Sequence, residues 1–196
     1  VRPDAGWVDG SSGNILARQT AADKYNYRLY LKEDAAGAGG LQLIAECDTG
    51  DGTKVQATTG VTDIANDGTT FTHVAATYDL PTGTLQLYVN GILVDSDVVL
   101  VPMTTNGVGP MSTRIGEGFN GLIDEVRIWD TTRTAAEILS QMAVPLAGDT
   151  ANLLSYYRFD DGVLGSDGAD DIWSTVDDPA DFSTGQVEDF VQTFFS

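Results

Sequence analysis

The amino-acid sequence predicts an all-β protein, an antiparallel β-sandwich with one short helix. The first observation is an alternation of apolar and polar residues, in which Leu85, Leu87 and Val89 share one face of an extended segment. The second is Asn90-Gly91, which lies between two such segments and suits a two-residue turn with positive φ at both positions. The third is a series of further short strand-like runs that Gly, Asp, Asn and Thr separate.

The predicted strands follow one another along the whole chain. They cover residues 14–19, 26–33, 41–46, 71–79, 84–94 and 153–159. Pro81-Thr82-Gly83 turns the chain between the fourth and fifth of these segments.

A short helix is predicted near residues 134–142. Thr134 and Glu137 have the spacing of a capping box, in which each side chain bonds to the backbone of the other residue. The apolar residues that follow at helical spacing are predicted to face the core, and they are Ile138, Leu139 and Met142.

Length and charge limit the classes of partner. At 196 residues the chain suits one domain over residues 1–196, because β-sandwiches of this size bury a full core. The formal net charge of -19 opposes binding to phosphate backbones, so we expect no nucleic acid partner. No apolar run approaches the ~20 residues that span a membrane. No signal-peptide pattern opens the chain, so we expect no membrane insertion.

Cys47 is the only cysteine, so no disulfide can form within the chain. An extracellular domain without disulfides is held by packing alone, which favours a bacterial, archaeal or viral origin over animal secretion. The negative charge of Asp48 beside Cys47 disfavours a thiolate. We therefore interpret Cys47 as a small buried hydrophobe and not as a nucleophile.

Residues 71–130 resemble the laminin G-like jelly-roll domains of the concanavalin A-like superfamily, including its pentraxin-related branch. The matching elements are, in order, Phe71, His73-Val74-Ala75, Tyr78-Asp79, Tyr88-Val89-Asn90-Gly91, Ile115-Gly116 and Phe119 to Ile128. The family more often has Trp at the position of Phe71. The resemblance implies a jelly-roll sandwich with a helix after the Asp-Glu-Val-Arg-Ile strand. It also implies a protein that binds sugar, protein or calcium more than one that catalyses a reaction.

The two ends of the chain depart from the family's order. Val1-Arg2-Pro3 resembles the middle of the family's second conserved piece, whereas residues 182–196 resemble the strand that usually comes first. The sequence therefore reads as though its terminal strands were permuted or exchanged. Three explanations remain open: the last strand fills its own sandwich, the chain is a unit of a tandem array, or the last strand completes a neighbouring subunit.

The sequence offers little support for catalysis. His73 is the only histidine and alternates with its neighbours in a predicted strand, so we interpret it as a packed structural residue. Glu125 and Asp130 are five residues apart, so on a regular strand they face opposite sides and cannot flank one glycosidic bond. Asp124 and Arg127 are interpreted as structural hydrogen-bonding residues. We predict no catalytic residues and no enzymatic activity.

The resemblance to pentraxin-like domains implies a calcium site where the loop after residues 14–19 meets the loop after Ile115-Gly116. The residues that carry over are Asp23, Asn26, Glu117 and Asn120. Calcium takes about six to eight oxygen ligands, which carboxylates, amides and loop carbonyls supply. The second loop is much shorter than in pentraxins, so we expect one calcium ion or none, and no other cofactor.

A sugar site needs an exposed aromatic ring near polar side chains. The aromatic residues near predicted loops are Trp7, Tyr25, Tyr27 and Trp173. For each of them, burial in the core is the stronger interpretation, because aromatic side chains dominate core packing.

These features together predict a non-catalytic module that acts outside the cell or on a cell or particle surface. Its expected partner is a glycan or a surface protein, with assistance from calcium. The alternative is a structural subunit of a filament, surface layer or virion, which assembles with copies of itself through its terminal strands. A carbohydrate-active enzyme is the third hypothesis.

Overall fold

The computed structural model describes residues 1–7, 10–21, 24–34, 40–48, 54–60, 63–99, 112–147 and 150–159. Within these residues it contains twelve strands and one helix. The elements are β1 (Arg2–Pro3), β2 (Ser12–Ala21), β3 (Lys24–Glu33), β4 (Leu41–Asp48), β5 (Lys54–Thr58), β6 (Val74–Asp79), β7 (Thr84–Val89), β8 (Ile92–Val98), β9 (Ser112–Ile115), β10 (Gly121–Leu122), β11 (Val126–Trp129), α1 (Ala135–Gln141) and β12 (Leu153–Tyr157).

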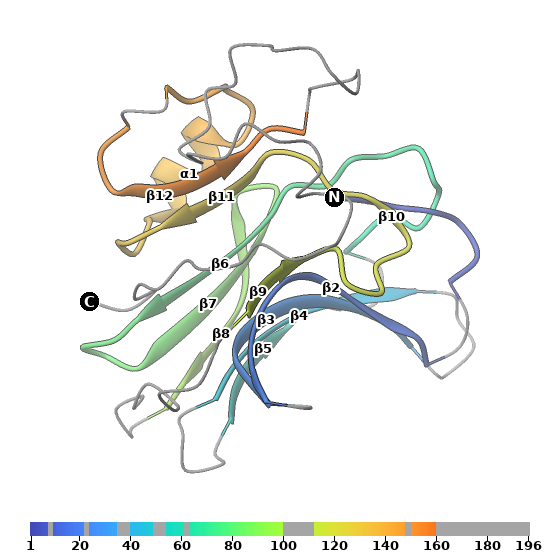
Figure 1. Ribbon diagram of the computed structural model, residues 1–196, viewed down its shortest axis with the longest axis horizontal. Coiled ribbons are helices and arrows are strands. Elements are labelled where there is room, and N and C mark those ends of the chain that lie inside the picture. Colours follow the sequence, from blue (N-terminus) through green and yellow to red (C-terminus); the bar gives the residue numbers. More distant parts are fainter. Residues whose placement is uncertain are drawn as a thin grey trace.

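Two antiparallel sheets face each other and form the sandwich (Figure 1). The larger sheet has the strand order β5-β4-β3-β2-β9, and the smaller has the order β6-β7-β8. Two further antiparallel pairs join β1 to β10 and β11 to β12. The prediction of an all-β antiparallel sandwich with one short helix is confirmed.

The hydrophobic core lies between the two sheets. Leu31 and Leu43 of the larger sheet, and Leu85 and Leu87 of the smaller, are at most 2% exposed. Burying one such side chain stabilises the folded state by about 1.5–3 kcal/mol. The burial of this apolar layer is therefore the main contribution that holds the two sheets together.

Two carboxylates of β8 close one side of the sandwich. The backbone N–H of Thr58 donates to Asp95 Oδ2 at 2.7 Å, and that of Gln56 donates to Asp97 Oδ2 at 3.2 Å. Thr58 and Gln56 belong to β5, which is the edge strand of the larger sheet. The side chains of one sheet thus satisfy the edge of the other, and the charges on that edge oppose pairing with a foreign strand.

The turn and the helix cap follow the sequence prediction. Asn90 and Gly91 have φ values of 50° and 75°, as a two-residue hairpin turn requires. Thr134 and Glu137 form the complete capping box at the start of α1. Ile138 is buried, but the expectation that Leu139 faces the core is wrong, because Leu139 is 53% exposed and lies against Gly91 at the margin of the sandwich.

Two of the predicted strands are shorter than expected. The strand expected from residue 71 begins at Val74, and the strand expected to reach residue 159 ends at Tyr157. Phe159 has a φ of 54°, a left-handed conformation that does not continue a strand. Residues 182–196, which resemble the family's first strand, lie outside the described part of the chain.

We predict that Gly91→Ala lowers the free energy of unfolding by more than about 1 kcal/mol. An added Cβ at this positive-φ position would lie 3.0 Å from the Leu139 Cα and 2.8 Å from its Cδ1. Urea denaturation measures the effect. Gly6→Ala is the matched control, because Gly6 also has positive φ but nothing lies within 4 Å of its added Cβ. Equal losses in the two variants would show that the contact with α1 is unimportant.

Candidate functional site

A row of polar side chains crosses three strands of the larger sheet. Arg28 on β3 pairs directly with Glu46 on β4, and Glu46 pairs directly with Gln56 on β5. Directly paired residues share one face of a sheet. The next row, which contains Leu29 and Ala45, faces the opposite side and packs against the core. The polar row therefore lies on the outer face of the sandwich.

Glu46 holds this row together. Its carboxylate accepts hydrogen bonds from Lys54 Nζ at 2.7 Å, from Arg28 Nη2 at 3.3 Å and from Gln56 Nε2 at 3.3 Å. The Glu46 side chain is only 5% exposed, whereas Arg28 and Lys54 are 21% and 45% exposed. A buried carboxylate requires such partners, and charge-assisted bonds to it fix the positions of the donors.

Two tyrosine rings flank the Arg28 guanidinium. Its central carbon lies 4.0 Å from the ring centroid of Tyr30 and 4.7 Å from that of Tyr25, which are cation–π distances. Tyr30 Oη accepts a hydrogen bond from Gln56 Nε2 at 3.4 Å, and burial raises the pKa of Tyr30. We call this group the outer-face cluster, and it consists of Tyr25, Arg28, Tyr30, Glu46, Lys54 and Gln56.

The outer-face cluster combines the two surfaces that a polar ring-shaped ligand needs. The partly exposed Tyr25 ring offers an apolar body with a polar tip, whereas Tyr30 is only 6% exposed and supports Arg28 from within. The guanidinium, ammonium, amide and carboxylate groups offer donors and acceptors in fixed directions. The bonds to Glu46 order these groups before any ligand arrives, which lowers the entropic cost of binding.

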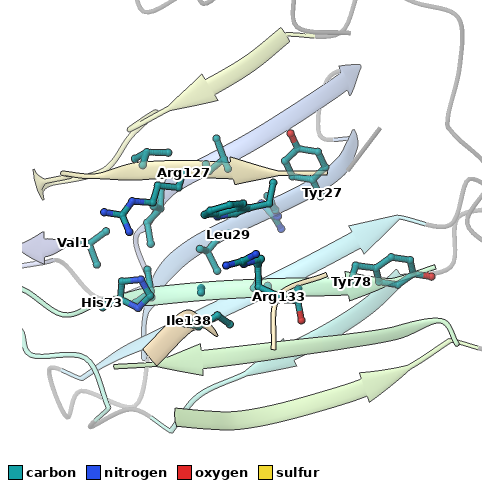
Figure 2. A pocket seen from close by; sticks show the side chains of 18 of the residues that line it. Val1, Tyr27, Leu29, His73, Tyr78, Arg127, Arg133 and Ile138 are labelled. Carbon is teal, nitrogen blue, oxygen red and sulfur yellow. The ribbon is translucent and has the colours of Figure 1, made fainter. Parts of the chain in front are cut away.

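A cavity of about 210 Å³ lies on the other side of the larger sheet (Figure 2). Its walls come from β6, from β11 and the residues before it, and from α1, and its floor comes from β2, β3 and β4. The side chains labelled in the figure are Val1, Tyr27, Leu29, His73, Tyr78, Arg127, Arg133 and Ile138. The lining is largely apolar, with basic groups on the side of β11 and α1.

His73 lies in the wall of this cavity. Burial lowers its pKa to about 4, and the positive charges of the Val1 amino group and of Arg127 act in the same direction. The imidazole is therefore neutral at pH 7. Its backbone N–H donates to Asn90 Oδ1 at 3.0 Å, which ties the start of β6 to the β7–β8 turn.

Cys47 lies in the core and is 4% exposed, as the sequence predicted. Burial raises the pKa of its thiol to about 12, and the negative charge of Glu46 adds to the increase. The thiol is therefore protonated at neutral pH, an environment that disfavours a nucleophilic role.

The charged residues near β11 stabilise the structure, although the premise of one prediction about them does not hold. Arg127 donates to the carbonyls of Gln141 at 2.6 Å and Val144 at 2.9 Å, and it pairs with Glu125 at 2.6 Å. Arg127 thus ties β11 to the end of α1, as expected. The comparison of Glu125 with Asp130 assumed a regular strand, but β11 begins at Val126 and Glu125 has a φ of 55°.

The residues predicted for calcium do not all come together. Glu117 lies near Tyr30 of β3, because the Glu117 carbonyl accepts from the N–H of Asn14, which pairs with Tyr30. Asn26 is four residues away from Tyr30 on the same strand. Four residues of a strand span ~13 Å, far more than one calcium ion with ligands at about 2.3–2.6 Å can bridge. The Glu117 carboxylate also pairs with Arg114.

Asn120 presents its backbone carbonyl to Trp7 Nε1 at 2.9 Å, and Asp23 lies outside the described residues. Among the residues that the structure describes, no group of three His, Cys, Asp or Glu side chains is placed to hold a metal ion. Calcium binding at the predicted residues stays a prediction.

The four aromatic residues named as candidates for sugar contact also lie in different places. Trp7 and Tyr27 are buried, with Trp7 packed edge-on against Phe119. Tyr25 is part of the outer-face cluster, and Trp173 lies outside the described residues.

The rest of the outer-face cluster escaped the sequence analysis. Alternation within residues 26–33 places Arg28 and Tyr30 on one face, but only the register of β3 against β4 shows that Glu46 lies beside them.

No helix among the described residues has the length and apolar composition needed to cross a bilayer.

Comparison with known proteins identifies a family over most of the chain. The laminin G-like family model described as the concanavalin A-like lectin/glucanases superfamily matches residues 1–139. A crystal structure of a protein from Bacteroides ovatus, suspected of binding carbohydrate, is similar with a TM-score of 0.49 and 24% sequence identity. That similarity covers 79% of this chain, and this chain spans 47% of the length of that protein. No protein with a curated description matches.

We predict that the free energy of unfolding decreases between pH about 6.5 and 4 because of His73. Its pKa is about 4 when folded and about 6.5 when unfolded, so the unfolded chain binds a proton that the folded chain does not. The stabilising contribution is complete above pH 6.5 and is lost as the pH falls, up to about 3 kcal/mol. Urea denaturation at pH 7, 6 and 5 measures it.

The matched variant for this test is His73→Gln, which cannot take up the proton. Its pH dependence should be shallower than that of the wild type, and the difference isolates His73 from the carboxylates. Parallel curves for the two proteins would contradict the assignment.

Proposed function

Since the chain belongs to the concanavalin A-like lectin/glucanases superfamily, we propose that it is a non-catalytic glycan-binding module whose sugar contacts the outer-face cluster. The observation that carries this proposal is the row Arg28–Glu46–Gln56, which the sheet register aligns beside Tyr25 and Tyr30. The row lies on the outer face, where a chain-like ligand has access from solvent.

Specific contacts support this proposal. Lys54 is the most exposed charged group of the cluster and keeps donors beyond the one that Glu46 uses. The Arg28 guanidinium carries five N–H donors, of which Glu46 and Tyr30 take some and the Nε–H is buried, so its terminal N–H groups are the ones left for a ligand. Sugar hydroxyl groups act as both donors and acceptors, so they pair with these groups and with the Gln56 amide.

The charge balance favours a neutral glycan. The chain carries a net charge of -19, and its field repels anionic ligands over long distances. Within the outer-face cluster, Glu46 offsets one of the two cations Arg28 and Lys54, which leaves little positive charge to attract an acidic sugar.

Binding is favoured over hydrolysis by the number of carboxylates. Glycoside hydrolysis uses two carboxyl groups about 5–10 Å apart. The outer-face cluster contains one, Glu46, and its three hydrogen bonds hold it in place as an anchor for the row. We infer that the module acts outside the cell or on a cell or particle surface, where glycans are displayed. A surface protein is the alternative partner.

We predict that Tyr25→Ala weakens glycan binding by about three- to tenfold, because an aromatic contact contributes ~0.5–1.5 kcal/mol. Arg28→Ala should weaken glycan binding at least as much, because this change removes the guanidinium donors and the cation–π contacts with Tyr25 and Tyr30. A glycan array with the wild type identifies the ligand, and calorimetry with that ligand gives the affinities.

Phe71→Ala is the matched control for these variants. Phe71 is an aromatic residue that is 50% exposed and lies beneath Arg2, away from the outer-face cluster. Its removal should leave the affinity unchanged. Equal losses in all three variants, or release of new reducing ends from the bound glycan, would contradict a binding site at the cluster.

We predict that a calcium site at the predicted residues shows itself as a higher melting temperature in calcium than in chelator. Binding at 100 times the dissociation constant stabilises a protein by about 2.7 kcal/mol. Glu117→Gln should remove the increase, whereas Glu137→Gln, which changes a carboxylate on α1, should keep it. The same melting temperature in both media would exclude calcium as a ligand of the folded chain.

A further inference from the structure

Asn120 and Gly121 form an Asn-Gly pair at the start of β10. Asn120 is exposed, and its backbone carbonyl accepts from the Asp4 N–H at 3.1 Å and from Trp7 Nε1 at 2.9 Å. Among the described residues, none forms a hydrogen bond that holds the side-chain amide of Asn120. The backbone of Asn120 is therefore fixed, whereas its amide group is free to turn.

The packing of β10 against β1 requires glycine at position 121. An added Cβ there would lie 2.3 Å from the Arg2 carbonyl oxygen and 2.8 Å from the Pro3 Cα. Gly121 also has a φ of 145°, which a residue with a side chain rarely adopts. Asn120 is thus followed by a residue that has no side chain to shield its backbone nitrogen.

The N–H of Gly121 points away from β1. Pro3 lies opposite Gly121, and the next pair along the ladder is the hydrogen-bonded pair of Asp4 and Asn120. Because hydrogen-bonded and non-hydrogen-bonded pairs alternate in an antiparallel ladder, Pro3 and Gly121 do not bond to each other. Pro3 has no N–H, which agrees with this placement. The β1–β10 ladder therefore leaves the Gly121 nitrogen available.

We propose that Asn120 is a site of spontaneous deamidation. The Gly121 nitrogen loses its proton and bonds to the Asn120 Cγ, the bond from Cγ to Nδ2 breaks, and the amide leaves as ammonia, which takes up one proton in exchange. The product is a cyclic succinimide. Water then opens the ring, which gives aspartate when the bond from Cγ to nitrogen breaks and isoaspartate when the bond from the backbone carbonyl carbon to nitrogen breaks.

The Asn-Gly pair in the β7–β8 turn is protected from the same reaction. Asn90 Oδ1 accepts from the His73 N–H at 3.0 Å, and the Asn90 N–H donates to the His73 carbonyl at 2.8 Å. Gly91 is buried against Leu139 of α1. Closing the ring at Asn90 requires breaking the bond to its side chain, which alone should slow the reaction about fivefold to tenfold.

Isoaspartate would change the contacts that residue 120 makes. The main chain would then run through Cβ and Cγ, and the former carbonyl would become part of a free carboxylate. This displaces the oxygen that accepts from Asp4 and Trp7. Trp7 is 9% exposed, and a buried indole N–H needs a partner. Deamidation at Asn120 therefore loosens the contact between residues 1–7 and β10 as the protein ages.

Ageing of the full chain in mildly alkaline buffer tests the proposal, because the Gly121 nitrogen must lose its proton. Mass spectrometry of peptides follows the rate at each Asn-Gly pair, and an isoaspartyl methyltransferase detects the isoaspartate. We expect Asn120 to react about tenfold faster than Asn90 or more. Asn106-Gly107 lies outside the described residues and is told apart by fragmentation of its peptide.

The same chain unfolded in urea is the matched control. Both pairs then lose their folded surroundings, so Asn120 and Asn90 should react at similar rates. A folded-state rate at Asn120 that is no higher than the rate at Asn90 would overturn the proposal. The proposal would also be overturned if Asn120 of the folded protein stayed intact for as long as the unfolded chain needs to react.

Two variants separate the altered backbone from the added charge. Asn120→Gln keeps the backbone contacts but must close a larger ring, so it should not react. Asn120→Asp adds the charge on a normal backbone. The melting temperature should fall on ageing in the wild type only, and fresh Asn120→Asp should match the fresh wild type. An equal fall in aged Asn120→Gln, or no fall in the aged wild type, would contradict the loosening at this site.

Discussion

The backbone groups at the sheet edges are the constraint on which the rest of this sandwich depends. Each edge strand exposes donors and acceptors that need partners. At β5 the partners are the carboxylates of Asp95 and Asp97, which reach across from the other sheet. Before β6 the partner is Val1, which pairs with Thr72, and among the described residues no strand pairs with the same edge of β6 itself. The two edges therefore differ, since one is closed by side chains and the other faces an enclosed space.

The same strands that line this space also build the outer face. On β3, Leu29 forms part of the cavity floor and its neighbour Arg28 belongs to the outer-face cluster. The alternation of a strand allows this division, because consecutive side chains point to opposite faces. Glu46 repeats it on β4, where its neighbours Ala45 and Cys47 are in the core. The hydrophobic core thus sets the register that aligns the polar row.

The sequence could predict the features that depend on near neighbours. The Asn90-Gly91 turn and the capping box of Thr134 need only residues a few positions apart, and both are present. It could not predict features that depend on tertiary contacts. Leu139 has helical spacing with Ile138, but it lies at the margin of the sandwich. The outer-face cluster depends on the pairing of β3 with β4 and β5, which alternation alone does not specify.

The cavity and the outer-face cluster lie on opposite sides of the larger sheet. Leu29 and Ala45 form part of the cavity floor, whereas the side chains of Arg28, Lys54 and Gln56 meet at Glu46 on the outer face. Because the polar row is held by Glu46 and by backbone pairing within the sheet, its geometry does not require an occupied cavity. A ligand can therefore bind at the outer face whether the cavity is filled or empty.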